Sequence, residues 1–206
     1  MKPLNKYIEE KLIVFHPQVD EKLVVNKNYN TYQYYPTTWK ELRHIIEERY
    51  NELGPGTKNE PIDFNDIDVS RITTFYSGGN NGTGLFEHTK FEYIDISDWN
   101  VSNITNMNWM FNVCHELRSI GNISKWNVSN AEDMSGMFRS CYMLESIGDL
   151  SKWKVSNIEN MQWMFYHCKH LKTVGDLSKW DISGVTDMQD MFTNSGITNT
   201  PDWYKE

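Results

Sequence analysis

The cysteines carry the most reactive side chains in this sequence, but their spacing argues against chemistry. Cys114, Cys141 and Cys168 follow one another at intervals of 27 residues. An odd number of evenly spaced cysteines does not form a disulfide framework, and a zinc site needs closely spaced pairs of ligands. A free cysteine behaves as a small hydrophobic residue. We therefore expect three buried thiols that fill a core.

Histidines and carboxylates also lack the spacing of a reactive site. His115, His167 and His170 lie close to the cysteines, but no two of them have the i, i+4 spacing with which a helix holds a metal ion. The many carboxylates accompany no recognisable nucleophile or base. We predict no metal, no cofactor and no catalytic residues.

A glycine-rich stretch, Ser77–Gly84, is the remaining candidate for chemistry. A phosphate-binding P-loop continues with Gly-Lys-Ser or Gly-Lys-Thr, and a dinucleotide-binding turn lies in a βαβ unit. The sequence has neither feature here. We expect a surface insertion, and an enzyme with its site at Gly78–Gly84 stays as the less favoured alternative.

The cysteines belong to a repeat that determines the predicted fold. Met107, Met110, Phe111 and Cys114 return 27 and 54 residues later, and the fourth copy has Ser195 at the cysteine position. A fixed period of this length is typical of solenoids. The i, i+3, i+4, i+7 spacing predicts a short helix in each repeat. Asn or Asp precedes each of these segments, as expected for a helix N-cap. Tryptophans mark the start of a short strand in each repeat: Trp99, Trp126, Trp153 and Trp180.

The sequence therefore predicts two regions. Residues 1–60 form a leader and a helical cap, in which a short helix begins near Leu4, a strand covers Glu21–Val25, and a helix covers 38–53. Thr38 and Glu41 have the spacing of a capping box. Residues 61–206 form an α/β solenoid, a short leucine-rich-repeat array of about five coils that ends in a C-terminal cap.

The charge distribution limits the partners. Residues 1–60 hold nine basic and nine acidic side chains, so the rest of the chain carries the whole net charge of −8. An acidic surface is unsuited to nucleic acid. The longest early apolar run, Leu12–Phe15, is too short for a signal peptide, and nothing resembles a membrane span. We expect a protein partner and a location in the bacterial cytoplasm or a phage particle. A place on the cell surface would require an export route that is not visible here.

The motif Met-Phe-x-x-Cys-x-x-Leu, preceded by Ser-Lys-Trp-x-Val-Ser-Asn, resembles the BspA-like leucine-rich repeat of bacterial surface proteins. It is carried here by Trp126–Asn130, Met137, Phe138, Cys141 and Leu144, and by their equivalents in neighbouring repeats. The resemblance covers about residues 62–200. It implies binding to other proteins and brings no catalytic residues. The block Thr38–Thr73 is similar to proteins encoded by gut bacteria and their bacteriophages.

These observations predict a non-enzymatic protein-interaction or structural module. The resemblance leaves two roles open: a bacteriophage virion or host-interaction component, and a bacterial cell-surface adhesin. The candidate tryptophans serve either an interface or packing between coils. The candidate charged residues form one outward-facing column. The candidate tyrosines lie in the leader, which docks either on the solenoid or on a partner. The candidate contact residues are Trp109, Trp163, Arg118, Glu145, Lys172, Tyr34 and Tyr35.

Overall fold

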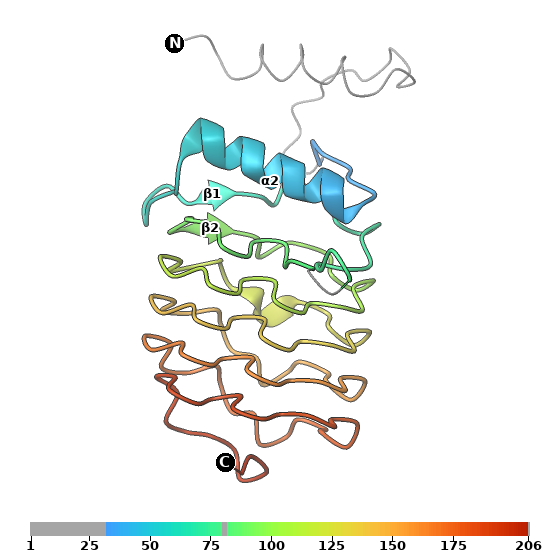
Figure 1. The fold of residues 1–206 in the computed structure, drawn as a ribbon, viewed down its shortest axis with the longest axis vertical. Helices are drawn as coiled ribbons and strands as arrows, with labels where there is room; N and C mark the ends of the chain where they lie inside the picture. The colour runs from blue at the N-terminus through green and yellow to red at the C-terminus, as the bar shows by residue number, and fades with distance from the viewer. Residues whose placement is uncertain (1–31, 80–81, 206) are drawn as a thin grey trace. The chain divides into compact units, whose positions relative to one another are not determined.

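The computed structural model describes residues 32–79 and 82–205, within one compact unit, Tyr32–Glu206. The helix and the strand expected near Leu4 and at Glu21–Val25 lie outside the described residues. In the described part, the chain forms helix α2 (Trp39–Leu53), strands β1 (Ile62–Asp63) and β2 (Ile94–Asp95), and a 3₁₀ helix, η1 (Ile123–Lys125). The rest of this unit is a series of turns stacked on one another (Figure 1).

Helix α2 lies across one end of this stack (Figure 1). It begins at a capping box, in which the Thr38 hydroxyl accepts a hydrogen bond from the Glu41 amide at 3.2 Å, and the Glu41 carboxylate accepts one from the Thr38 amide. It ends before Gly54, whose φ of +76° suits a residue without a Cβ. Leu42 and Ile46 are its buried residues, so the helix covers the core of the first coil.

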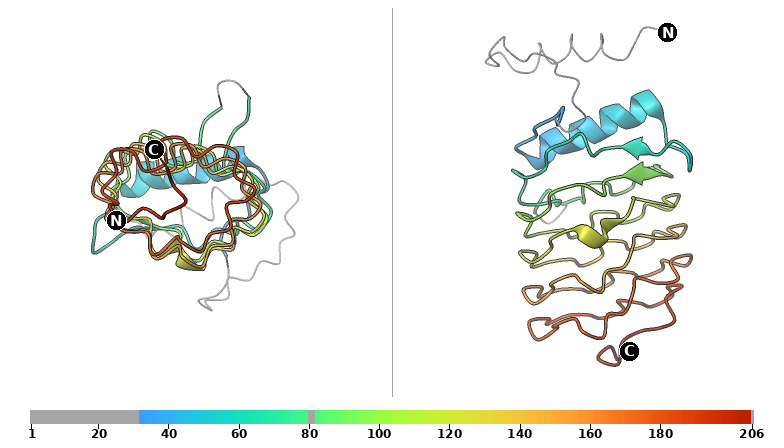
Figure 2. Two further views of the ribbon diagram at one scale, coloured as in Figure 1. Left: turned by 90° about the horizontal axis from the view of Figure 1, so that it is seen from below. Right: turned by 180° about the vertical axis from the view of Figure 1, so that it is seen from behind.

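Successive coils are joined through parallel backbone pairing. β1 pairs with β2, and Ile62 lies opposite Ile94. A second contact joins Ser119 to Ser146, one coil further on. Viewed along the stack, the coils follow nearly the same closed outline (Figure 2). The longest line of bridges connects one residue from each of five coils: Thr74, Asn106, Asp133, Asn160 and Asp187.

The short helices expected after these bridge residues are absent from the described coils, and that prediction is wrong. In the segment 107–114, Met110 donates to the Met107 carbonyl at 3.3 Å, whereas Met107 and Trp109 donate to carbonyls of the next coil. The amides thus alternate between local turns and the neighbouring coil. Trp109 and Val113 have φ values of 58° and 60°. Left-handed residues four positions apart cannot continue a right-handed helix.

The residues predicted as helix caps do accept amide hydrogen bonds, but in turns. The Asn106 side chain accepts from the Asn108 amide at 2.9 Å, and the Asp133 side chain accepts from the Ser135 amide at 2.8 Å. The preference of Asn and Asp for such bonds is shared by helix caps and turns. This preference therefore identified the residues that accept amide hydrogen bonds, but it could not distinguish a helix cap from a turn.

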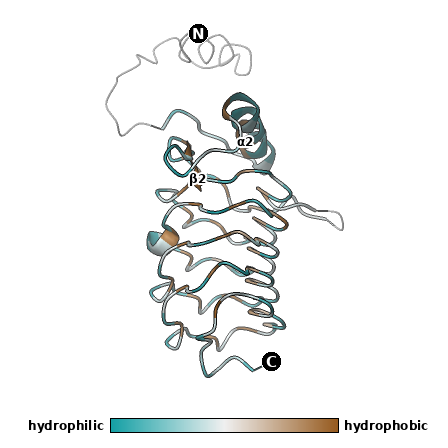
Figure 3. Cartoon of the chain, turned by 90° about the vertical axis from the view of Figure 1, so that its left-hand side faces the viewer, coloured by the Kyte–Doolittle hydropathy of each residue, from teal (hydrophilic) through white to brown (hydrophobic). Residues whose placement is uncertain are grey.

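The core consists of side chains that repeat along the stack. The chain coloured by hydropathy shows hydrophobic positions recurring from coil to coil (Figure 3). Phe111 and Phe138 stack at 5.4 Å between ring centroids, and the same contact recurs in neighbouring coils. Trp126 is buried, and its indole nitrogen donates to the Ile96 carbonyl of the preceding coil at 3.2 Å. Each coil therefore buries its apolar residues against its neighbours, and a single coil would leave them exposed.

The thiols complete this core, and the prediction that they are buried is confirmed. Cys114, Cys141 and Cys168 are free and buried. The Cys141 thiol donates to the Phe111 carbonyl at 3.1 Å, and Cys168 makes the equivalent contact to Phe138. Burial raises the pKa of both Cys141 and Cys168 well above its ordinary value. The thiols of Cys141 and Cys168 are therefore neutral hydrogen-bond donors between coils.

Candidate functional site

Trp109 and Trp163 meet on the surface although they are 54 residues apart in the sequence. Their ring centroids are 6.0 Å apart, and both side chains are half-buried. They occupy the same position in two coils that are separated by a third. Gly136 holds that position in the coil between them, and a Cβ added to it would lie 3.0 Å from the Trp109 ring. The small residue lets the two indoles contact each other across the intermediate coil.

Arg139 lies beside this pair. Its guanidinium carbon is 5.6 Å from the centroid of the Trp109 ring, 5.9 Å from that of Trp163 and 5.8 Å from that of Tyr166. A cation over aromatic rings is stabilised by their electron-rich faces. One guanidinium nitrogen also donates to the Asn112 side chain at 3.2 Å. Arg139 thus links three aromatic side chains from two coils.

Further aromatic and basic side chains continue this surface along the coils. His115 stacks on Tyr142, with ring centroids 4.6 Å apart and an interplanar angle of 8°. The Lys169 ammonium lies 5.3 Å from the Tyr142 centroid, and His167 contacts both Tyr142 and Tyr166. We name this surface the aromatic–cationic strip. It comprises Trp109, His115, Arg139, Tyr142, Trp163, Tyr166, His167 and Lys169.

The electrostatics of the strip are set by its unpaired cations. The ion pairs found among the described residues involve neither Arg139 nor Lys169. Burial lowers the pKa of His167, and the positive charges of Lys169 and Arg139 lower it further. In a chain whose net charge is −8, the strip thus holds two cations, Arg139 and Lys169, that make no direct ion pair within the described chain.

The predicted column of charged residues is paired in part. Arg118 contacts Glu145 at 3.3 Å and Glu92 at 3.8 Å, and both Arg118 and Glu145 line a shallow pocket of about 290 Å³. Lys172 does not continue this pairing, because its ammonium donates to the Lys169 carbonyl at 3.2 Å. These exposed pairs contribute at most about 1 kcal/mol each.

The two predicted tyrosines differ in environment. Tyr34 pairs with Ile67 through a backbone bridge, and Arg49 lies over its ring at 5.1 Å. Tyr35 is 50% exposed, and its hydroxyl donates to the Tyr32 carbonyl at 2.8 Å. Tyr34 therefore docks on the first coil, and Tyr35 stays accessible at the surface.

The glycine-rich segment forms the arms of a hairpin. Tyr76 pairs with Gly84 in an antiparallel bridge, and the Ser77 amide donates to the Thr83 carbonyl at 2.9 Å. Residues 80–81 lie outside the described residues. The described residues of this segment line neither the pocket beside Arg118 and Glu145 nor the polar groove beside Asn103.

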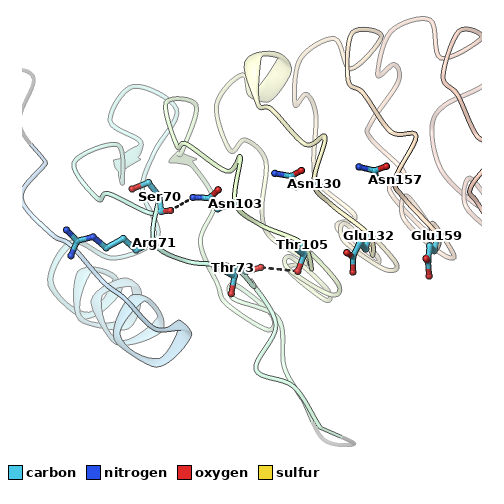
Figure 4. Close-up of a pocket in the computed structure, with 9 residues that line it drawn as sticks. All are labelled: Ser70, Arg71, Thr73, Asn103, Thr105, Asn130, Glu132, Asn157 and Glu159. Atoms are coloured by element: carbon cyan, nitrogen blue, oxygen red, sulfur yellow. Dashed lines mark hydrogen bonds between the residues drawn. The ribbon is translucent and has the colours of Figure 1, made fainter.

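A polar groove of about 550 Å³, which the sequence analysis did not single out, lies on the coils beside the bridge residues (Figure 4). Its asparagines each donate to a serine carbonyl of the preceding coil at 2.7 Å. This ladder satisfies backbone carbonyls between coils, and Glu132 and Glu159 add negative charge on the other side of the groove (Figure 4). The groove is lined by Ser70, Arg71, Thr73, Asn103, Thr105, Asn130, Glu132, Asn157 and Glu159.

Sequence reasoning identified the two tryptophans of the strip but missed Arg139, Tyr142 and Tyr166. The available signal for Arg139 and Tyr166 was their position in the repeat. Arg139 lies three residues after Gly136, and Tyr166 lies three residues after Trp163. Gly136 and Trp163 are the repeat equivalents of Trp109. In a helix, side chains three residues apart in the sequence would lie next to each other. In the turn segment, the contact to Arg139 instead crosses from one coil to the next.

Comparison with known proteins identifies the class of the chain. Residues 81–203 match the family described as Mycoplasma protein of unknown function, DUF285. The match covers more than half of the chain and contains the repeat, so the chain belongs to this family. No curated protein and no solved structure matches it. No helix in the described ranges is long and apolar enough to cross a membrane.

Proposed function

We propose that this chain is a non-enzymatic protein-interaction module built on BspA-like leucine-rich repeats, with an α/β solenoid architecture closed by the helical cap at α2. The sequence motif and the stacked 27-residue coils support the repeat type. The strip supports the interaction role, and it is the docking surface in this proposal.

The contact between Trp109, Arg139 and Trp163 is the observation that carries the proposal. Trp, Tyr and Arg are the residue types that contribute most to binding at protein interfaces. Here they come from three coils, remain partly accessible, and are held in place by the coils beneath them. A rigid surface loses little conformational entropy when a partner binds.

The proposal is tested by affinity capture from the native cells with matched variants. Trp109→Asn and Trp163→Asn remove the indoles, and Asn tolerates the left-handed backbone at these positions. Each change at a dominant contact should cost about 2 kcal/mol of binding free energy. Lys152→Gln is the control, because Lys152 is exposed and lies outside the strip. Capture of the same proteins by all three variants and by the unaltered chain would contradict the proposal.

A further inference from the structure

The cations of the strip lack the carboxylate partners that three other arginines of the described chain have. Arg49 contacts the Asp66 carboxylate at 2.7 Å, Arg43 contacts Glu47 at 2.7 Å, and Arg118 contacts Glu145. Arg139 is as enclosed by aromatic rings as Arg49 is, yet its side-chain hydrogen bond goes to a neutral amide, that of Asn112. A guanidinium has five N–H donors. Most of those on Arg139 therefore remain available to a ligand.

Lys169 repeats this situation one coil further along. Its ammonium rests on the Tyr142 ring and, in the described part of the chain, pairs with no carboxylate. Burial lowers the pKa of His167, and the positive charges of Lys169 and Arg139 lower it further, so both cations act on this side chain. Neither cation is neutralised by a direct ion pair among the described residues. Glu87 is linked to Arg139 through the Asn112 amide, which accepts from Arg139 and donates to Glu87.

We propose that the aromatic–cationic strip binds an acidic segment of the partner protein, and that Arg139 and Lys169 receive its carboxylates. This inference rests on the proposed function and specifies the partner's chemistry. Arginine pairs with a carboxylate through two parallel hydrogen bonds, and stacking on aromatic rings fixes the plane of the guanidinium in advance. Trp109, Trp163 and Tyr142 then offer apolar surface to the residues between the carboxylates.

The charge of the whole molecule favours a short acidic segment over nucleic acid. Nucleic-acid binding depends on many Lys and Arg side chains that neutralise successive phosphates. The strip supplies two unpaired cations, and the chain around it is acidic. A long polyanion would meet repulsion beyond the strip, whereas a segment that carries two or three carboxylates would not.

The test uses the full chain and a labelled synthetic peptide that contains alternating Glu and Phe. A peptide with Gln in place of Glu is the matched probe. We expect the Glu peptide to bind at least about tenfold more tightly than the Gln peptide, with an affinity that falls as salt is added. Arg139→Gln and Lys169→Gln should each remove most of this difference, whereas Lys152→Gln should preserve it. Lys169 is exposed, so its variant tests the proposal even if Arg139→Gln is unstable.

Equal binding of the two peptides, or binding of neither, would overturn the acidic-segment proposal. Tighter binding of a single-stranded oligonucleotide would also overturn it. These outcomes are separate from the capture experiment. If the Trp variants lose the native partner while the peptides are not distinguished, the docking surface stands and its acidic ligand falls. If the Glu peptide binds but the Trp variants retain every partner, the proposed function falls.

Discussion

At the scale of single residues, position within the repeat separates core cysteines from reactive ones. Cys141 and Cys168 are fully buried, each donates to a backbone carbonyl of the preceding coil, and burial raises both pKa values. A thiolate reacts with alkylating agents much faster than a thiol. These two thiols should therefore be unreactive, and Cys114, which is 1% exposed, should be shielded from reagents by its burial.

We predict that iodoacetamide at pH 8 leaves Cys114, Cys141 and Cys168 unmodified in the folded chain and alkylates all three in denaturant. Intact-mass spectrometry measures both outcomes. A free cysteine-containing peptide in the same tube serves as the control for reagent activity. Rapid labelling of the folded chain would show that the coils open locally, or that the thiols are accessible to solvent.

Aspartates in the turns make the stability of the fold dependent on pH. Hydrogen bonds from Ser151 hold the pKa of Asp149 below its ordinary value, and Ser178 does the same for Asp176. A lowered pKa in the folded state stabilises the fold at any pH above the unfolded value of about 3.9. This contribution is lost as the pH falls through the folded-state pKa.

We therefore predict that the combined variant Asp149→Asn and Asp176→Asn loses less stability between about pH 5 and about pH 3 than the unaltered chain does. The structure contains its own precedent, because Asn122 occupies the equivalent turn and accepts from the Ser124 amide at 3.0 Å. Urea unfolding across this pH range measures the effect. Identical pH dependence of the two chains would refute the role given to these carboxylates.

At the scale of elements, the sequence predicted which side chains are buried better than it predicted the backbone between them. Met107, Met110, Phe111 and Cys114 are all buried, as their repetition indicated. The same spacing wrongly predicted a helix, because hydrophobic periodicity reports side-chain direction and not hydrogen bonding. The left-handed backbone at Trp109 and Val113 has no signal in residue type, since neither residue favours it.

The aromatic–cationic strip was hidden for a related reason. Trp109 and Trp163 stood out by residue type. Their contact, however, depends on Gly136 in the coil between them and on the alignment of three coils. The capping box of α2, by contrast, is a local signal, and the helix begins directly after Thr38. Local pairs can be read from one stretch of sequence, whereas contacts across coils require the register of the stack.

The junction between α2 and the first coil depends on Arg49. Its two terminal guanidinium nitrogens each donate to one oxygen of the Asp66 carboxylate, and the guanidinium lies over the rings of Tyr34 and Phe64. We predict that Arg49→Ala lowers the free energy of unfolding by about 2–3 kcal/mol, because it leaves the partly buried Asp66 carboxylate unpaired.

Arg118→Ala is the matched control for Arg49→Ala, since Arg118 also pairs with carboxylates but does so at a more exposed site. It should cost less than about 1 kcal/mol. Denaturant unfolding of both variants gives the comparison. Equal losses would show that the cap does not depend on the Arg49 contact.

At the scale of the whole molecule, different segments of the chain close the two ends of the coil stack. At the α2 end, the helix supplies donors to the first coil: Arg43 donates to the Leu85 carbonyl at 2.6 Å, and Trp39 donates to the Phe75 carbonyl at 3.2 Å. At the other end, Trp203 stacks on Trp180 and donates to the Leu177 carbonyl at 3.0 Å, and Tyr204 packs against Phe192. The C-terminal residues thus cover the core without supplying a further coil.

The segment 188–194 of the last coil consequently has backbone amides without a carbonyl partner in the described chain, whereas the equivalent amides of earlier coils are paired. In the coil that contains residues 134–140, every second backbone amide donates to a carbonyl of the next coil. These donor amides belong to Met134, Gly136, Phe138 and Ser140. No backbone acceptor among the described residues faces the equivalent amides, namely those of Met188, Asp190, Phe192 and Asn194. In a repeat array, stability is a sum of contacts between neighbours, so an end coil that lacks one neighbour opens more readily.

We predict that the amides of residues 188, 190, 192 and 194 exchange hydrogen for deuterium much faster than those of 134, 136, 138 and 140. Both sets lie at the same positions of the repeat, so each slow amide is an internal control for a fast one. Exchange measured residue by residue by NMR gives the comparison. Comparable protection of the two sets would contradict an open edge, because an amide without a protein acceptor is protected only when something else covers it.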